Sequence, residues 1–105
     1  MKFLSINTYH IDKLGDAAKA TAKLNANPPD GYKLLAIYSC LANPFPGVEL
    51  PPGTMVTFSV VESDNAESLA SATLEMTLAG VNVNRIPVME IPTGEVEETV
   101  EKLKM

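Results

Sequence analysis

The sequence is poor in the residues that build disulfides and metal sites. Its 105 residues include one cysteine, Cys40, one histidine, His10, and no tryptophan. One cysteine cannot form an intrachain disulfide, and one Cys with one His cannot supply the ligands of a zinc or iron–sulfur site. We therefore expect no metal and no other cofactor. A single cysteine is also typical of a cytoplasmic protein.

Positive charge and long apolar runs are scarce as well. Eight basic and 13 acidic residues give a formal net charge of −5, which excludes a general attraction for nucleic acid or an anionic membrane. No apolar run approaches the roughly 20 residues that span a bilayer, and residues 1–7 lack the apolar core of a signal peptide. With 46% hydrophobic and 20% charged residues, the chain is predicted to fold as one globular domain over residues 1–105.

The pattern of apolar residues changes period several times along the chain. Alternation predicts strands at 2–9, 32–40, 54–61 and 81–91, and three- and four-residue spacing predicts helices at 11–26, 65–78 and 95–104. Asp64 followed by Glu67 resembles a capping box at the start of the second helix. Pro87 indicates that part of the last strand lies at an edge of the sheet or forms a bulge. Four prolines and two glycines make 41–53 a long loop.

This order of elements, β-α-β-β-α-β with an additional C-terminal helix, predicts an α+β fold of the ferredoxin-like type. Right-handed crossovers would place the first two helices on one face of a four-stranded antiparallel sheet. The strands at 32–40 and 54–61 are apolar on both faces. Because one chain has no second layer for the open face, we expect a homodimer.

Three segments resemble a known family. They are K-F-L-x-x-x-T-Y-H followed by D-K-L at the start, P-P-D-G before K-L-L-x-x-Y, and V-V-E-S-D-N-A-E-S-L-A after the third strand. They are similar to small dimeric α+β-barrel proteins known only as a domain of unknown function, and the resemblance covers about residues 2–90. It implies the fold and the dimer, and it implies no activity.

Several polar residues alternate with apolar ones in the predicted strands. Ser5, Asn7 and Tyr9 share one side of the first strand, and Thr57 and Ser59 alternate with apolar neighbours in the third. We assign Leu4 and Ile6 to the helix-covered core, which turns these five polar residues toward the open face. There they could line a ligand pocket or pair across the dimer interface.

His10 and Arg85 are the remaining candidates. His10 follows Tyr9 where the first strand passes into the helix, and it could transfer a proton or simply bond to nearby backbone. Arg85 could hold a carboxylate or phosphate in a bidentate contact, or pair with an acidic residue of a partner chain.

Two hypotheses about function follow. In the first, the protein binds a small molecule in a pocket at the sheet, lined by Ser5, Asn7, Tyr9, His10, Thr57, Ser59 and Arg85. In the alternative, it is a small cofactor-free enzyme, similar to a monooxygenase or an isomerase, in which His10 and Tyr9 are catalytic. The alternative rests on analogy between folds, which is weak support for an activity.

Overall fold

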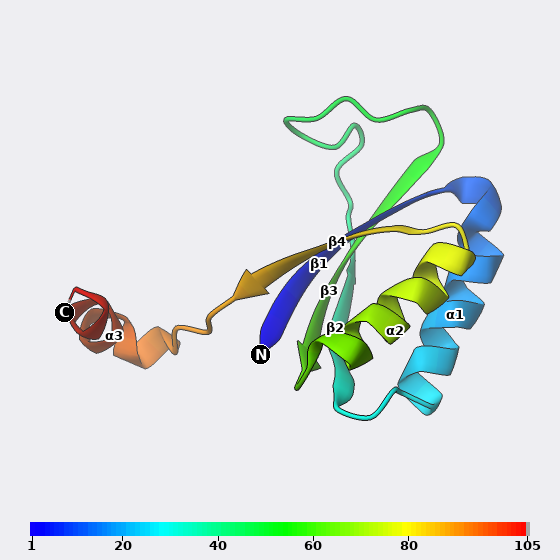
Figure 1. Cartoon of the computed structure of the whole chain (residues 1–105). Coiled ribbons are helices and arrows are strands. Elements are labelled where there is room, and N and C mark those ends of the chain that lie inside the picture. The colour runs from blue at the N-terminus through cyan, green and yellow to red at the C-terminus, as the bar shows by residue number, and fades with distance from the viewer. Residues whose placement is uncertain (105) are drawn as a thin grey trace.

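The computed structural model describes residues 1–104 and confirms the predicted ferredoxin-like α+β fold. Its elements are β1 (Lys2–His10), η1 (Ile11–Lys13), α1 (Leu14–Ala26), β2 (Tyr32–Ser39), β3 (Thr54–Ser63), α2 (Ala66–Leu78), β4 (Asn82–Val88), η2 (Thr93–Glu95) and α3 (Val96–Leu103). The four strands form one antiparallel sheet in the order β2-β3-β1-β4. Helices α1 and α2 cover one face of it (Figure 1).

The ends of the elements follow local sequence signals. Helix α1 ends before Pro28 and Pro29, because proline disfavours the helical conformation of the residue before it and cannot donate a backbone hydrogen bond. Asn65 is the N-cap of helix α2, and its side chain accepts a hydrogen bond from the Ser68 amide at 2.8 Å. The predicted cap at Asp64 was therefore one residue early. Pro87 lies in β4, which pairs with β1 alone and is an edge strand as predicted.

The assignment of the two faces of β1 was wrong. Phe3 packs against the core cluster that contains Leu24 of α1 and Ala72 of α2, and Tyr9 packs with Ala17 of α1. Ser5 and Asn7 lie between them on the same side of the strand and are buried. The odd-numbered residues of β1 therefore face the helices.

Leu4, Ile6 and Thr8 consequently lie on the open face. The register pairs Leu4 with Val60 and Ile6 with Phe58, so the open face of the central strands is apolar. Alternation along a strand separates its residues into two faces, but it does not say which face a helix covers. That choice depends on the packing of α1 and α2 across all the strands.

The apolar core on the helix-covered face is divided into two clusters. One contains Leu24, Tyr32, Val61 and Ala72, with Phe3, Leu34, Leu69 and Met76 packed against it. The other contains Tyr9, Ala17 and Val81, with Met55, Met76 and Val83. Met76 touches both clusters.

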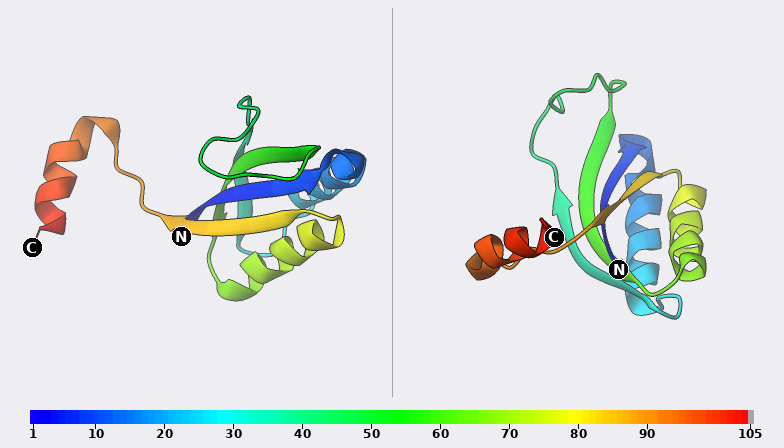
Figure 2. Two further views of the ribbon diagram at one scale, coloured as in Figure 1. Left: turned by 90° about the horizontal axis from the view of Figure 1, so that it is seen from above. Right: turned by 60° about the vertical axis from the view of Figure 1, so that its left-hand side comes forward.

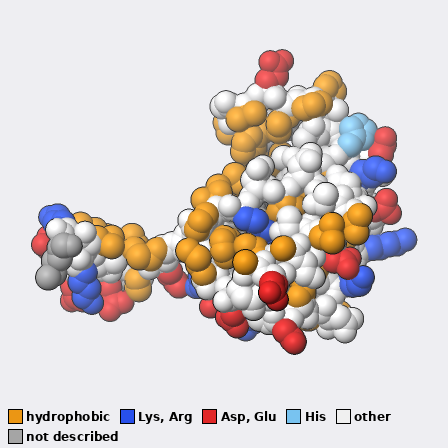
Figure 3. Space-filling model, in the orientation of Figure 1, with side chains coloured by type: hydrophobic (Ala, Val, Ile, Leu, Met, Phe, Trp, Pro, Cys, Tyr) orange, Lys and Arg blue, Asp and Glu red, His pale blue; other side chains and the backbone are white. Residues whose placement is uncertain are grey.

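The long loop between β2 and β3 and the C-terminal segment lie outside this core. Phe45 of the loop packs against Phe58 on the open face, with ring centroids 6.1 Å apart. Helix α3 projects beyond the end of β4, on the side of the sheet away from α1 and α2 (Figure 2). Its apolar residues Val96, Val100 and Leu103 are exposed. In Figure 3, apolar side chains extend along this arm to where it joins the body.

Candidate functional site

A pocket of about 620 Å³ lies between the sheet and α1. Apolar side chains from α1 and β2 form most of its wall, and polar side chains of β1, β3 and β4 form the part nearest the middle of the sheet. Its lining residues are Asn7, Tyr9, Leu14, Ala17, Ala18, Thr21, Ala22, Leu24, Asn25, Tyr32, Leu34, Leu35, Ala36, Ile37, Thr57, Ser59, Met76, Val81 and Arg85. Its size and mixed lining are typical of a small-molecule site.

The pocket follows from the way the core is divided. On β1, the helix-facing residues run from Phe3 through Ser5 and Asn7 to Tyr9. On β3, their partners in register run from Val61 through Ser59 and Thr57 to Met55. Both strands are therefore apolar at their ends and polar in the middle. The small polar side chains leave space between the two apolar clusters.

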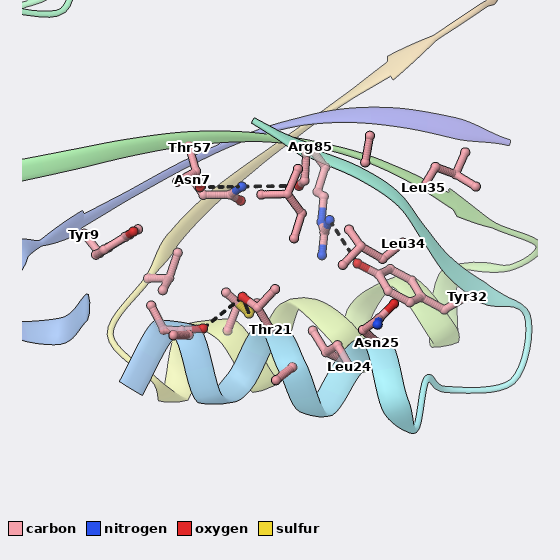
Figure 4. Close-up of a pocket in the computed structure, with 18 of the residues that line it drawn as sticks. Asn7, Tyr9, Thr21, Leu24, Asn25, Tyr32, Leu34, Leu35, Thr57 and Arg85 are labelled. Carbon is pink, nitrogen blue, oxygen red and sulfur yellow. Dashed lines mark hydrogen bonds between the residues drawn. The ribbon is translucent and has the colours of Figure 1, made fainter. Parts of the chain in front are cut away.

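Asn7 is bound to the neighbouring strand inside this space. Its side-chain nitrogen donates to the hydroxyl oxygens of Ser59 and Thr57 at 3.2 and 3.3 Å. Figure 4 shows these bonds at the sheet side of the pocket, with α1 opposite. Because both hydroxyls come from β3 and the amide from β1, the three polar groups hold one another in place.

Arg85 extends from β4 across the same face of the sheet toward Tyr32 (Figure 4). Its Nη1 donates to the Ser5 hydroxyl oxygen at 2.8 Å and to the Tyr32 hydroxyl oxygen at 3.5 Å. Its Nε donates to the hydroxyl oxygen of Thr73 of α2 at 3.2 Å. The guanidinium carbon lies 5.7 Å from the centre of the Tyr32 ring. Every one of these partners is neutral.

Of the seven predicted ligand-binding residues, five line the pocket: Asn7, Tyr9, Thr57, Ser59 and Arg85. Ser5 is fully buried behind it and is in contact with Arg85. The five predicted residues of β1 and β3 come together on the helix-covered face, and the prediction that they face the open side of the sheet was wrong.

His10 does not line the pocket. It is exposed at the surface (Figure 3), and its Nδ1 accepts the backbone N–H of Asp12 at 3.1 Å, which caps η1. A Cβ added to Gly53 would lie 2.8 Å from His10 Nε2, so the ring is packed against the end of the β2–β3 loop. These contacts agree with the second interpretation of His10, in which the ring bonds to nearby backbone where the strand passes into the helix.

Sequence reasoning missed Tyr32, Thr73 and most of the α1 wall. Tyr32 follows the Asp30-Gly31 turn, and its position two residues before Leu34 could have marked it as helix-facing. The register of β2 shifts between Leu34 and Ala36. The face of a residue on one side of this irregularity therefore could not be inferred from the alternation on the other side. Thr73 lies on the same side of α2 as Leu69 and Met76. That pattern predicts packing in the core and gives no sign of a hydrogen bond to an arginine.

Residues 1–104 contain neither a metal-binding cluster nor a membrane-spanning helix. No group of three or more His, Cys, Asp or Glu side chains in this range could hold a metal ion. None of the helices described is both long and apolar enough to cross a membrane.

The chain is similar to several solved structures at low sequence identity. One is prephenate dehydratase from Streptococcus mutans, with 20% identity over 81% of this chain and a TM-score of 0.49. The chain spans 41% of the length of that protein. Another is the periplasmic divalent cation tolerance protein CutA from Archaeoglobus fulgidus, with 11% identity, 98% and 99% coverage of the two chains and a TM-score of 0.45.

No family model and no curated protein matches the sequence. The similarity to the two solved structures is too distant to transfer a ligand or an activity. The pocket itself therefore provides the evidence about function.

Proposed function

We propose that this protein binds a small molecule in the pocket between the sheet and α1. The observation that carries the proposal is the division of the core. A continuous apolar core would stabilise the fold more than a buried row of Ser, Asn and Arg side chains. Here that row lies against a cavity large enough for a ligand, and the two strands share the same pattern of apolar ends and polar middle.

We also propose that the protein is a homodimer formed through the open face of the sheet. That face carries Leu4, Ile6 and Val60, which a single chain leaves half-buried. Ile86, at the outer edge of the face, is 42% exposed. An apolar sheet face of this kind needs a second layer, and the same face of a second copy can supply it. The exposed stripe of α3 would then pack against the partner.

The two proposals give the two faces of the sheet different functions, ligand binding on the helix-covered face and dimerisation on the open face. Residues of one chain form the pocket, and we propose that ligand binding does not depend on the partner. We further propose that residues 1–105 act as one domain and that the protein is cytoplasmic, a prediction that rests on the single cysteine. The enzymatic alternative has no comparable support, because His10 lies outside the pocket.

A pocket-filling variant tests the ligand-binding proposal. Ala18 lines the pocket from α1 and is exposed at its mouth, so Ala18→Trp should fill the pocket and leave the fold intact. Ala26→Trp, on the same helix but outside the lining, is the matched control. A metabolite collection would be screened by thermal shift against the wild type and both variants.

We expect at least one compound class to raise the melting temperature of the wild type and of Ala26→Trp, and not that of Ala18→Trp. The proposal fails if no compound class stabilises the folded wild type. It also fails if every stabilising compound acts equally on Ala18→Trp, because the site would then lie elsewhere.

A further inference from the structure

The pocket contains a positive charge without a negative partner. Arg85 is the only charged side chain among its lining residues. Although the chain has 13 acidic residues, no carboxylate within residues 1–104 forms an ion pair with Arg85. Because a half-buried charge loses hydration, an anion at this position would compensate it.

Two donor groups near this charge have no acceptor among the residues described. Arg85 uses Nε and Nη1 for its bonds to Thr73, Ser5 and Tyr32, and its Nη2 makes none. The Tyr32 oxygen accepts from Arg85, and its own O–H proton is not donated within residues 1–104. Both groups belong to residues that line the pocket, so they can meet one ligand.

We propose, on the basis of the ligand-binding function above, that the ligand is a carboxylic acid with an apolar body. Its carboxylate would accept hydrogen bonds from Arg85 Nη2 and the Tyr32 hydroxyl, and its body would lie against Leu24, Leu34 and Met76. A guanidinium suits a carboxylate geometrically as well as electrostatically. A phosphate monoester carries about −1.5 to −2 charges at pH 7, which one arginine without a lysine balances less well.

The single arginine of the chain makes a direct test possible. In an ¹⁵N-labelled sample, the Nε–Hε signal of Arg85 is the only arginine signal of its kind. The protein would be titrated with octanoate, octanamide and octyl phosphate, and the Arg85 signal and the dissociation constants would be followed. We expect octanoate to shift the signal and to bind about 10-fold or more tightly than octanamide, because only the acid makes charge-assisted bonds.

Substitutions locate the anion in the pocket. Arg85→Met should weaken octanoate binding roughly 10-fold or more, to the level of the amide. Tyr32→Phe keeps the buried ring and should weaken octanoate binding by a smaller factor. Tyr38→Phe, on the exposed open face, is the matched control and should leave binding unchanged. If Arg85→Met does not fold, the wild-type titration and Tyr32→Phe still decide the matter.

Three results in which octanoate binds would overturn the inference. They are equal affinities for octanoate and octanamide, octanoate binding that leaves the Arg85 signal unmoved, and tighter binding of octyl phosphate than of octanoate. None of these results excludes the proposed ligand-binding function, which is tested separately by the thermal-shift comparison of the wild type with Ala18→Trp. The absence of octanoate binding also overturns the inference, whereas the proposed function falls only with the wider thermal-shift screen.

Discussion

The two faces of the sheet differ in an unexpected way. The face that α1 and α2 cover has buried polar side chains in its middle, including Ser5, Asn7 and Ser59. The face that no helix covers is apolar along its central strands, with Ile6 paired to Phe58. In a monomer that uses its helices only to complete a core, the opposite distribution would be expected. The difference supports the two proposals made above, a binding site on the covered face and a dimer interface on the open face.

The largest expected effect comes from charging the open face. Phe58→Asp would place an unpaired charge where Phe45 and the proposed partner exclude water. It should destabilise the protein by roughly 3 kcal/mol or more, measured by urea unfolding. Leu74→Asp, on the exposed outer side of α2, is the control. Equal stability of the two variants would contradict a covered open face.

Charging the edge of the open face should separate assembly from folding. Because Ile86 is exposed in the single chain, Ile86→Asp should leave the monomer folded and remove the dimer. Light scattering reports the mass, and circular dichroism reports the fold. A folded Ile86→Asp variant that remains fully dimeric at micromolar concentration would exclude an interface through this face.

Helix α3 should contribute less than the sheet. Its Val100 is 39% exposed in the single chain, so burying the remaining area would contribute about 0.7 kcal/mol per chain, or about 1.4 kcal/mol for the two copies in a dimer. Val100→Ser should therefore weaken dimerisation about tenfold, as measured by sedimentation equilibrium. Glu98→Ser, on the opposite side of the helix, provides the comparison. If both substitutions have the same effect, the apolar stripe does not pack on the partner.

On the covered face, Ser5→Ala should have a moderate effect. The Ser5 hydroxyl is fully buried and accepts a hydrogen bond from Arg85 at 2.8 Å. Its loss should cost about 1–2 kcal/mol of unfolding free energy. Thr8→Ala, at an open-face position of the same strand, should cost less. If Thr8→Ala lowers the unfolding free energy more than Ser5→Ala does, the buried polar groups of the covered face do not contribute as the structure suggests.

The smallest effect is expected at the end of the sheet, where Lys2 and Glu90 form an exposed ion pair at 2.7 Å. The hydrogen bond and charge of Lys2 lower the pKa of Glu90, and those of Glu90 raise the pKa of Lys2. The stabilisation from Glu90 is therefore present at neutral pH and is lost as the pH falls through its lowered pKa. The stabilisation from Lys2 is lost as the pH rises through its raised pKa.

Because both groups are exposed, Glu90→Gln should barely change stability at pH 7 in low salt, and the difference should vanish at acid pH or in high salt. Urea unfolding at two pH values checks this. A large change at pH 7 would mean that this end of the sheet is covered by something other than solvent.

The sequence predicted the element order and the sheet well, because alternation, helical spacing and prolines act locally. Pro28 and Pro29 ended α1, and Pro87 marked an edge strand. The prediction failed where the choice is made by packing between distant segments. The polar residues of β1 were recognised, but the period of two is the same for either face. A sharper signal was present, since Phe3 and Tyr9 are apolar on the same side as Ser5 and Asn7.

The site was predicted only in part for the same reason. Asn7 and Arg85 stood out as polar residues among apolar ones. The bonds of Arg85 to Tyr32 and Thr73 depend on the register of β2 and on the position of α2, which no local pattern specifies. His10 stood out because it is the only histidine, yet its ring caps a turn. Rarity alone is therefore a weak guide to function in this chain.

The central claim is that the covered face binds a ligand and the open face forms the dimer. Native mass spectrometry of the wild type and Ile86→Asp, each with octanoate, would test it. The account predicts a wild-type dimer that carries one octanoate per chain, and an Ile86→Asp monomer that still carries one. A monomeric wild type would contradict the role of the open face. Loss of octanoate together with the dimer in Ile86→Asp would contradict a pocket built within one chain.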